Sequence, residues 1–309
     1  MPNQKERTAN NSQRGLYYLL FAIICIIWGT TWFALKSGID NGLPSFRGAG
    51  IRFLLTAFIF VPIIIFRKPQ LPKKISDWVG MIFLGIFYFF IPYACIYWSE
   101  KHIPSYLAAV IYGIVPLLVI IFSHFMLHNE QMSFLKVVSA LIGISGVFII
   151  SIARNPEEGN MHLWGVIAMF FASISTAFCT AYTKKYVSRN DVFLFLGVQI
   201  FVGGLLLLLL SIAVEKPFTL KMNLYALISI IYLAVFGTAV AWTMWIFLIS
   251  KISVVLVSYV SFFVPVVAVI VGTVLGNEKL SPLVMIGAIL VLISILSVIH
   301  VQKKQDYFL

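Results

Sequence analysis

The stretch VFLFLGVQIFVGGLLLLLLSIAV, at residues 192–214, carries no charged side chain. A helix needs about 20 consecutive apolar residues to cross the roughly 30 Å hydrocarbon core of a bilayer. This stretch meets that length, and Gln199 is the lone amide deep within it. We therefore predict a membrane-spanning helix here.

The same pattern recurs along the whole chain of 309 residues, of which 61% are hydrophobic and 11% charged, with a mean hydropathy of +1.00. This composition excludes a soluble protein, because folding alone does not remove so much apolar surface from water. The connectors leave no room for a separate soluble domain, so we expect an all-α polytopic membrane protein with ten transmembrane helices. The ten apolar runs are 16–36, 46–66, 77–98, 104–126, 132–153, 163–183, 192–214, 222–248, 253–275 and 282–301.

The charged residues indicate an orientation. The formal net charge is +11, and most Lys and Arg residues lie in connectors beside the apolar runs. With the N-terminus inside, about twice as many of them fall on the inner side as on the outer side, which is the bias of the positive-inside rule. We expect a multi-pass protein of the cell membrane, inner or plasma, with both termini cytoplasmic. The expected partners are the lipid bilayer and a small-molecule substrate, with no nucleic acid.

An internal repeat appears when the fourth and ninth runs are aligned, so that Pro116 falls on Pro265. After a single-residue slip, Asn-Glu-Gln-Met-Ser at 129–133 falls on Asn-Glu-Lys-Leu-Ser at 277–281. Shared Val, Ile and Leu positions carry no information between two apolar helices. The paired Pro and the paired Asn-Glu are harder to obtain by chance, so they indicate a duplicated unit.

The duplication divides the chain into two five-helix units, 16–153 and 163–301, between the tails 1–15 and 302–309. Because five is odd, the second unit must enter the membrane from the opposite side, which predicts two inverted repeats. Inverted halves can exchange conformations and open a central site to either face in turn. This arrangement favours a secondary transporter over a receptor or a structural span.

The residues that follow also resemble a known family. The sequence WGTTWFALK at 28–36, then Pro44 with Ala49, Arg52 and Phe53, and the two Pro…Asn-Glu units are similar to the EamA branch of the drug/metabolite transporter superfamily. The resemblance implies ten helices around a central cavity. It also implies transport, typically export, of amino acids or other small metabolites.

Arg52 is the first candidate for the transport path. A guanidinium well inside a span costs on the order of 2.5–3.5 kcal/mol on insertion scales, and it normally faces the interior of the bundle or water. The alternative is a structural role, in which Arg52 binds backbone carbonyls at a broken helix. The sequence leaves both interpretations open.

Aromatic and hydroxyl side chains inside the runs are further candidates to line the cavity. Rings on one helix face can form a stacking wall, and hydroxyl groups at helical spacing can bind a polar solute. The alternatives are interfacial anchoring for tryptophan and helix packing for the small polar residues. The predicted cavity residues besides Arg52 are Trp28, Trp32, Tyr93, Tyr112, Thr176, Thr180, Gln199, Trp242 and Tyr259.

Pro116 and Pro265 lie inside the fourth and ninth runs, where a missing N–H and a ring clash would kink the backbone. We take them as candidates for gating, with a passive effect on helix shape as the alternative. In the connectors that follow, Ser133 suits the N-cap of the next helix, and Pro282 suits a first helical position.

The sequence also bears on metal binding, cofactors and enzymatic activity. Cys25, Cys95 and Cys179 fall inside runs without a metal-ligand spacing, so we predict no metal, no cofactor and no enzymatic activity. The alternatives are a multispan membrane enzyme acting on a lipid-linked substrate, or a channel. We expect a monomer or a weak homodimer.

Overall fold

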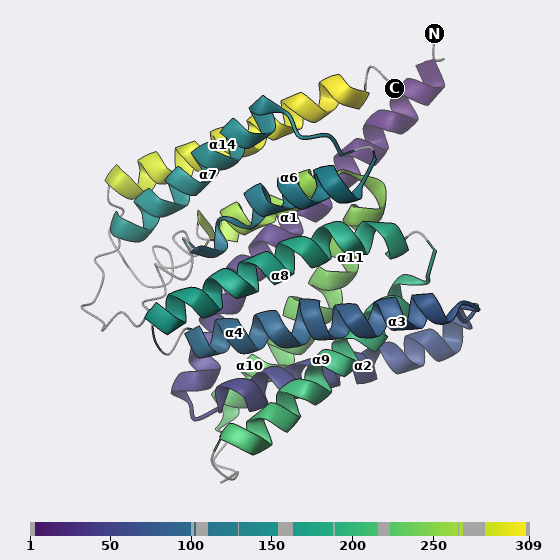
Figure 1. Ribbon diagram of the computed structural model, residues 1–309, viewed down its shortest axis with the longest axis vertical. Coiled ribbons are helices and arrows are strands. Elements are labelled where there is room, and N and C mark those ends of the chain that lie inside the picture. Colours follow the sequence, from purple (N-terminus) through teal and green to yellow (C-terminus); the bar gives the residue numbers. More distant parts are fainter. Residues whose placement is uncertain are drawn as a thin grey trace.

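The computed structural model describes residues 4–99, 102, 111–128, 130–153, 163–187, 189–215, 223–264, 266–267 and 282–306 (Figure 1). Throughout these ranges the regular structure is helical, and no strand occurs in them. The first half contains α1 Gln4–Asp40, α2 Ser45–Arg67, α3 Ile75–Leu84, the π-helix η1 Gly85–Phe90, α4 Ile91–Ser99, α6 Val115–Met126 and α7 Phe134–Ala153. The second half contains α8 Leu163–Val187, α9 Val192–Val214, α10 Leu224–Ala234, the π-helix η2 Val235–Val240, α11 Ala241–Lys251, α12 Val254–Ser258 and α14 Pro282–Asp306.

Six helical segments in the described part are long and apolar enough to cross a membrane. They are Ser45–Arg67, Ile75–Ser99, Leu163–Val187, Val192–Val214, Leu224–Lys251 and Pro282–Val301. Shorter apolar helices at Gly15–Thr31, Val115–Met126, Phe134–Ile150 and Val254–Val264 overlap the remaining four predicted runs. The chain is thus an all-helical, multi-pass membrane protein, whereas ten full spans in two inverted repeats stay a prediction.

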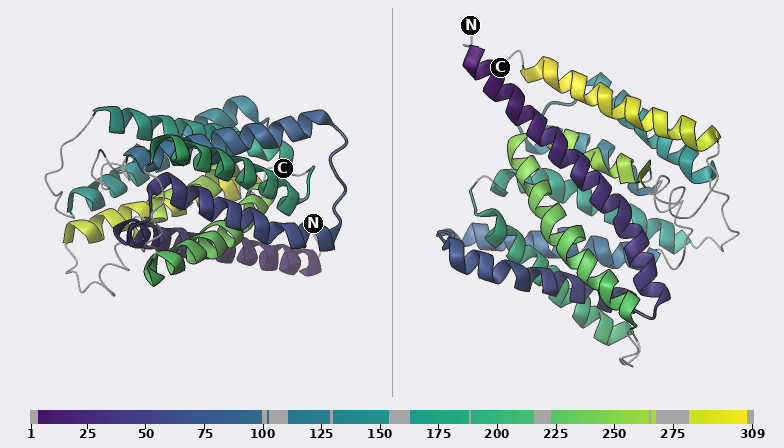
Figure 2. Two further views of the ribbon diagram at one scale, coloured as in Figure 1. Left: turned by 90° about the horizontal axis from the view of Figure 1, so that it is seen from below. Right: turned by 180° about the vertical axis from the view of Figure 1, so that it is seen from behind.

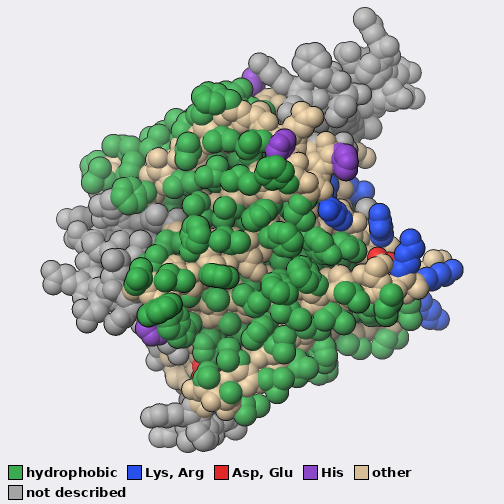
Figure 3. Space-filling model, in the orientation of Figure 1, with side chains coloured by type: hydrophobic (Ala, Val, Ile, Leu, Met, Phe, Trp, Pro, Cys, Tyr) green, Lys and Arg blue, Asp and Glu red, His purple; other side chains and the backbone are tan. Residues whose placement is uncertain are grey.

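The outer surface has the character of a lipid-facing surface. Large apolar side chains cover most of the face in Figure 3, while Lys and Arg gather at one end of it. Phe66, Phe134 and Phe125 expose about four-fifths of their area, at 85%, 81% and 79%. In water such exposure would be strongly unfavourable, and in a bilayer it is not.

The connectors meet at two ends of the bundle. At one end, the turns after α2, α6, α8 and α11 come together, and we call it the basic end because Arg67, Lys136 and Lys184 lie there (Figures 1 and 3). At the other end, Glu215 after α9 meets the start of α2, and we call it the Glu215 end. Both described chain ends lie toward the basic end (Figure 2).

α2 and α9 form an antiparallel pair that is fastened at both ends. At the basic end, Arg67 Nε lies 3.3 Å from Asp191 Oδ2. At the other end, the Glu215 carboxylate accepts hydrogen bonds from the backbone N–H groups of Phe46 at 2.9 Å and Arg47 at 3.1 Å. A carboxylate at these unpaired N–H groups also suits the positive end of the α2 dipole. Midway, Gly204 lets the α2 backbone approach closely.

α7 and α14 form the second antiparallel pair, on the opposite side of the bundle (Figure 1). A Cβ atom placed on Gly146 would lie 2.7 Å from the carbonyl oxygen of Gly287, and one placed on Gly287 would lie 2.7 Å from that of Gly146. Ser294 Oγ donates to Ser139 O at 2.7 Å nearby. Glycine therefore permits contact between two backbones, as small residues do where membrane helices pack closely.

The helix ends test several expectations. Ser133 Oγ accepts a hydrogen bond from Lys136 N at 3.3 Å, and α14 begins at Pro282, so the predicted cap and the predicted first-turn proline are confirmed. Pro116 lies in the first turn of α6 rather than inside a longer described helix, directly after a turn at residues 113–114. A proline in a first helical turn needs no N–H partner, and the kink and gating role predicted for Pro116 stay predictions. Pro265 lies outside the described residues.

Replacing Gly146 by Ala should lower the apparent melting temperature of the detergent-solubilised protein by several degrees. The reason is steric, because the new Cβ would meet the Gly287 carbonyl and cannot be accommodated by a side-chain rotation. Gly15→Ala is the matched control, since a Cβ there meets nothing within 4 Å and alanine favours a helix. Equal melting temperatures for the two variants, measured by size-exclusion thermal stability, would contradict the close contact.

Candidate functional site

The central site is organised by the wide turn of η2 in the middle of the α10–α11 helix. A π turn shifts the backbone hydrogen bonds out of the α-helical register and is often found at functional positions. Here the carbonyl oxygen of Gly237 accepts from Trp28 Nε1 at 3.2 Å and from Arg52 Nη2 at 3.2 Å. One carbonyl thus links α1, α2 and η2.

Arg52 is held by η2 on two sides. Its Nε donates to Thr238 Oγ1 at 2.6 Å, and the Thr238 hydroxyl donates in turn to Leu233 O at 2.8 Å. The guanidinium carbon lies 5.4 Å from the centre of the Phe53 ring and 5.7 Å from that of Tyr93. These distances permit cation–π attraction. The side chain is 5% exposed, so its charge is stabilised by dipoles and rings rather than by bulk water.

Aromatic rings from five elements form one connected cluster, which reaches Arg52 through Phe53 and Tyr93. Trp28 of α1 lies 5.5 Å from Trp242 and 5.0 Å from Trp245, both on α11, as centroid distances. Phe89 of η1 lies 4.6 Å from Trp242. The Phe53 ring of α2 continues the cluster, at 5.5 Å from Phe89 and 4.7 Å from Tyr93 of α4. We call this set, with Tyr88, the aromatic cluster.

Hydroxyl groups of α8 border the aromatic cluster. Tyr88 OH lies 2.7 Å from Thr180 Oγ1 and accepts from Trp245 Nε1 at 3.1 Å. One turn away, Tyr112 OH donates to Thr176 Oγ1 at 3.4 Å. The predicted hydroxyl stripe therefore faces tyrosines of the first half, and Thr180 connects it to the cluster.

Two buried polar atoms of the predicted residues have no hydrogen-bond partner within the described part of the chain. They are Trp242 Nε1, in the middle of the aromatic cluster, and Gln199 Oε1 on α9. The Gln199 amide nitrogen donates to Phe195 O at 2.9 Å, so only its oxygen is unpaired. A buried donor without an acceptor costs about 1–3 kcal/mol. The unpaired Trp242 N–H therefore requires an explanation, and a bound solute with an oxygen acceptor would supply the missing partner.

The structure brings five of the ten predicted cavity residues together. Trp28, Arg52, Tyr93 and Trp242 join the aromatic cluster directly, and Thr180 joins it through Tyr88. Tyr259 is buried with its OH 2.5 Å from Ser139 Oγ of α7, and the cavity role predicted for it stays a prediction. Its phenol joins the end of α12 to α7 through this hydrogen bond. Trp32 lies in α1, but its side chain is outside what the structure describes.

Sequence reasoning missed Tyr88, Phe89, Thr238 and Gly237. For Tyr88 a signal existed, because its phenol is a polar group in the apolar run, the same property that indicated Tyr93. For Gly237 and Thr238 no signal existed, since their roles depend on the wide turn of η2.

A second feature lies at the basic end, where Glu130 joins the two halves of the chain. Its Oε1 accepts from Val254 N at 3.0 Å, and its Oε2 accepts from Ser253 Oγ at 2.8 Å. Lys136 Nζ lies 3.9 Å from Oε2, with 1% of its side chain exposed. Lys184 Nζ donates to Ile249 O and Ile252 O at the end of α11. The carboxylate caps α12 between buried ammonium groups.

Comparison with known proteins relates the chain to transporters. The EamA-like transporter family matches residues 15–152 and 163–299. The uncharacterized inner membrane transporter YedA of Escherichia coli K12 is 29% identical over 270 residues, covering 86% of this chain and 84% of YedA. The uncharacterized transporter YvbV of Bacillus subtilis is 25% identical over 287 residues, covering 93% and 92%. A protein of known crystal structure shares the fold, with a TM-score of 0.79, 18% identity, and coverage of 94% and 98%.

The hydrogen bond between Arg52 and Thr238 should appear as thermodynamic coupling. We expect Arg52→Met and Thr238→Val each to lower the melting temperature, and the double variant to lose clearly less than the sum, because both remove the same contact. The control is Arg52→Met combined with Ser294→Ala on the distant α14, where the losses should add. Additive losses for the first pair would show that the contact contributes nothing to stability.

Proposed function

Because this chain belongs to the EamA-like transporter family of the drug/metabolite transporter superfamily, we propose that it carries a small organic solute of the amino-acid class through the aromatic cluster by alternating access. The single observation that carries the proposal is the indole N–H of Trp242, which is buried between the rings of the aromatic cluster and has no hydrogen-bond partner among the described residues. A solute that brings an acceptor to this N–H replaces the missing partner.

The chemistry of the cluster supports the solute class. A carboxylate suits Arg52, whose guanidinium offers a fixed fork of donors. An ammonium group suits the faces of Trp28, Trp242 and Tyr93. Because these groups belong to one connected cluster, they match a molecule that combines both charges with an apolar body. Thr180 and Tyr88 add hydroxyl groups that can select a polar substituent.

The two-unit architecture supports alternating access. α2 pairs with α9, and α7 pairs with α14, and each helix holds the same position in its unit as its partner does. The π-helices η1 and η2 also hold matching places, each in the third long helix of its unit. We take these correspondences as support for two inverted five-helix repeats, 16–153 and 163–301, related by a pseudo-twofold axis in the membrane plane.

The orientation follows from the basic end. The positive-inside rule supports a cytoplasmic location for the basic end and for both chain termini. Closure at that end is supported by the cap that Glu130 makes on α12 and by the Arg67–Asp191 pair. Opening toward the cytoplasm then requires α12 to leave Glu130. We propose export or exchange as the mode of transport, from the function typical of the family.

Counterflow in proteoliposomes, with a panel of labelled amino acids and amines, tests the proposal. The wild-type chain should show saturable, counterflow-stimulated uptake, and Trp242→Phe should raise the KM roughly two- to tenfold, the worth of one hydrogen bond. Trp28→Ala and Arg52→Ala should lower uptake further. Trp164→Phe is the matched control, because Trp164 is 70% exposed. No counterflow for any solute would overturn the carrier mechanism and favour a channel or an enzyme.

Closure at the basic end has its own test. In a variant with all three cysteines replaced, a new cysteine at Ser258 of α12 is buried and should react slowly with a maleimide. Adding Glu130→Gln weakens the cap, so we expect labelling from the basic side to accelerate several-fold. Glu215→Gln, at the opposite end, is the matched control and should leave the rate unchanged. Equal rates for both would refute a closing role for Glu130.

A further inference from the structure

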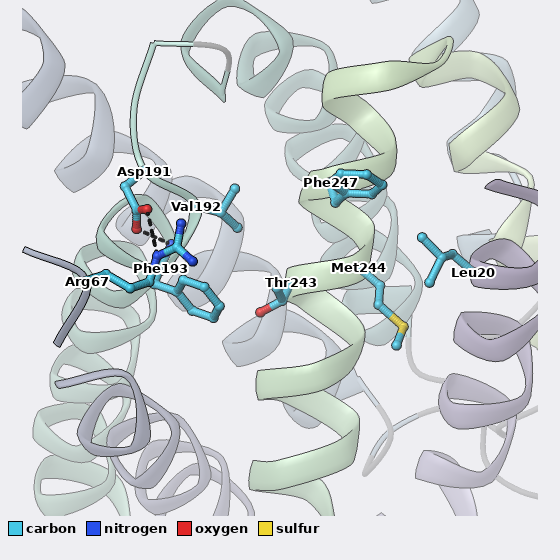
Figure 4. A pocket seen from close by; sticks show the side chains of 8 residues that line it. All are labelled: Leu20, Arg67, Asp191, Val192, Phe193, Thr243, Met244 and Phe247. Atoms are coloured by element: carbon cyan, nitrogen blue, oxygen red, sulfur yellow. Dashed lines mark hydrogen bonds and ion pairs between the residues drawn. The ribbon is translucent and has the colours of Figure 1, made fainter. Parts of the chain in front are cut away.

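A pocket of roughly 260 Å³ lies near the basic end, and no residue of the aromatic cluster lines it (Figure 4). α1 contributes Leu20, α9 contributes Phe193, and α11 contributes Thr243, Met244 and Phe247. Its wall is almost entirely apolar. The ion pair of Arg67 and Asp191 forms a charged border, and Thr243 adds one hydroxyl group to the wall (Figure 4).

The apolar wall limits what can occupy this pocket. Leu16 and Leu19, beside Leu20 on α1, are 46% and 57% exposed, so the neighbouring surface faces lipid. Small polar solutes gain nothing from an apolar wall, and the volume lies below the roughly 300–1,000 Å³ typical of sites for drug-sized ligands. A flexible hydrocarbon chain fits both the wall and the size.

The rim of the pocket is basic. Arg67 exposes 57% of its side chain, and only its Nε is engaged by Asp191. Asp191 is already occupied, because its Oδ1 accepts from the N–H groups of Phe193 and Leu194. Lys68 follows Arg67, Arg189 precedes Asp191 by two residues, and Lys251 lies one helical turn beyond Phe247 on the same face. Arg67 thus borders the pocket itself, and three further cations lie in the sequence within four residues of the lining residues.

We propose that this pocket binds one acyl chain of an anionic phospholipid, with the phosphate of its headgroup held by Arg67, Lys68, Arg189 and Lys251. Basic groups at a membrane surface attract anionic lipids, and a pocket between helices adds shape selection. The bound chain would fill the space between α1, α11 and the α2–α9 pair. The bound lipid would then hold these helices together at the basic end.

Native mass spectrometry of the delipidated, full-length protein tests the site, with dioleoyl phosphatidylglycerol and dioleoyl phosphatidylcholine as probes. We expect one phosphatidylglycerol to bind at least fivefold more tightly than phosphatidylcholine. Thr243→Trp, which fills the pocket, should remove this tightest site. Lys251→Gln should weaken it roughly fivefold, the expected worth of one cation near a membrane surface.

Matched controls separate the pocket from general surface binding. Ser297→Trp places the same ring on an exposed position of α14, and Lys73→Gln removes a cation of the basic end that does not border the pocket. Both should retain the tight site. Leu20→Trp fills the pocket from α1 and replaces Thr243→Trp if that variant does not fold.

Three outcomes would overturn the proposal. Equal affinity for the two lipids would exclude headgroup recognition. Loss of binding in Lys251→Gln but not in either filling variant would place the lipid on the surface. Intact lipid binding in Thr243→Trp, together with loss of solute transport, would assign the pocket to the solute path.

Discussion

The carbonyl oxygen of Gly237 is the point on which the centre of the bundle depends. In a bilayer, no water is available to pair with a backbone group that leaves the helical register, so each such group needs a donor from the protein. Trp28 and Arg52 supply two donors to this one oxygen, and each comes from a different helix. The wide turn of η2 thereby fixes where α1 and α2 stand, and the aromatic cluster assembles around the arginine that this pairing holds.

The same requirement bears on the two roles that the sequence left open for Arg52. Its contacts with Gly237 and Thr238 are those expected of a structural strut, while its distances to the rings of Phe53 and Tyr93 are those expected at a binding position. These roles are compatible, because a guanidinium has five donors and the described contacts use only part of them. A fixed charge with donors to spare is pre-organised for a solute.

The sequence was sufficient for the features that depend on composition or on local spacing. The run at 192–214 became α9, Ser133 became a cap, and Arg52 was identified because a buried cation is costly. It was insufficient for the π-helices, because GIFYFF and VFGTAV have no residue in common at matching positions. The partner of Tyr259 was beyond the sequence for a related reason: its phenol can serve packing or a cavity, and its hydrogen bond to Ser139 joins segments that are 120 residues apart.

The contact between Gly146 and Gly287 has a mechanical consequence. Where two backbones touch, no side chain is available to change rotamer and absorb a displacement. A shift of α7 along α14 by one helical turn would bring Ile150 to the place of a glycine, where the opposing backbone leaves no space. The pair can therefore pivot about this contact but cannot slide, which makes it a fulcrum for any rocking of one half of the bundle against the other.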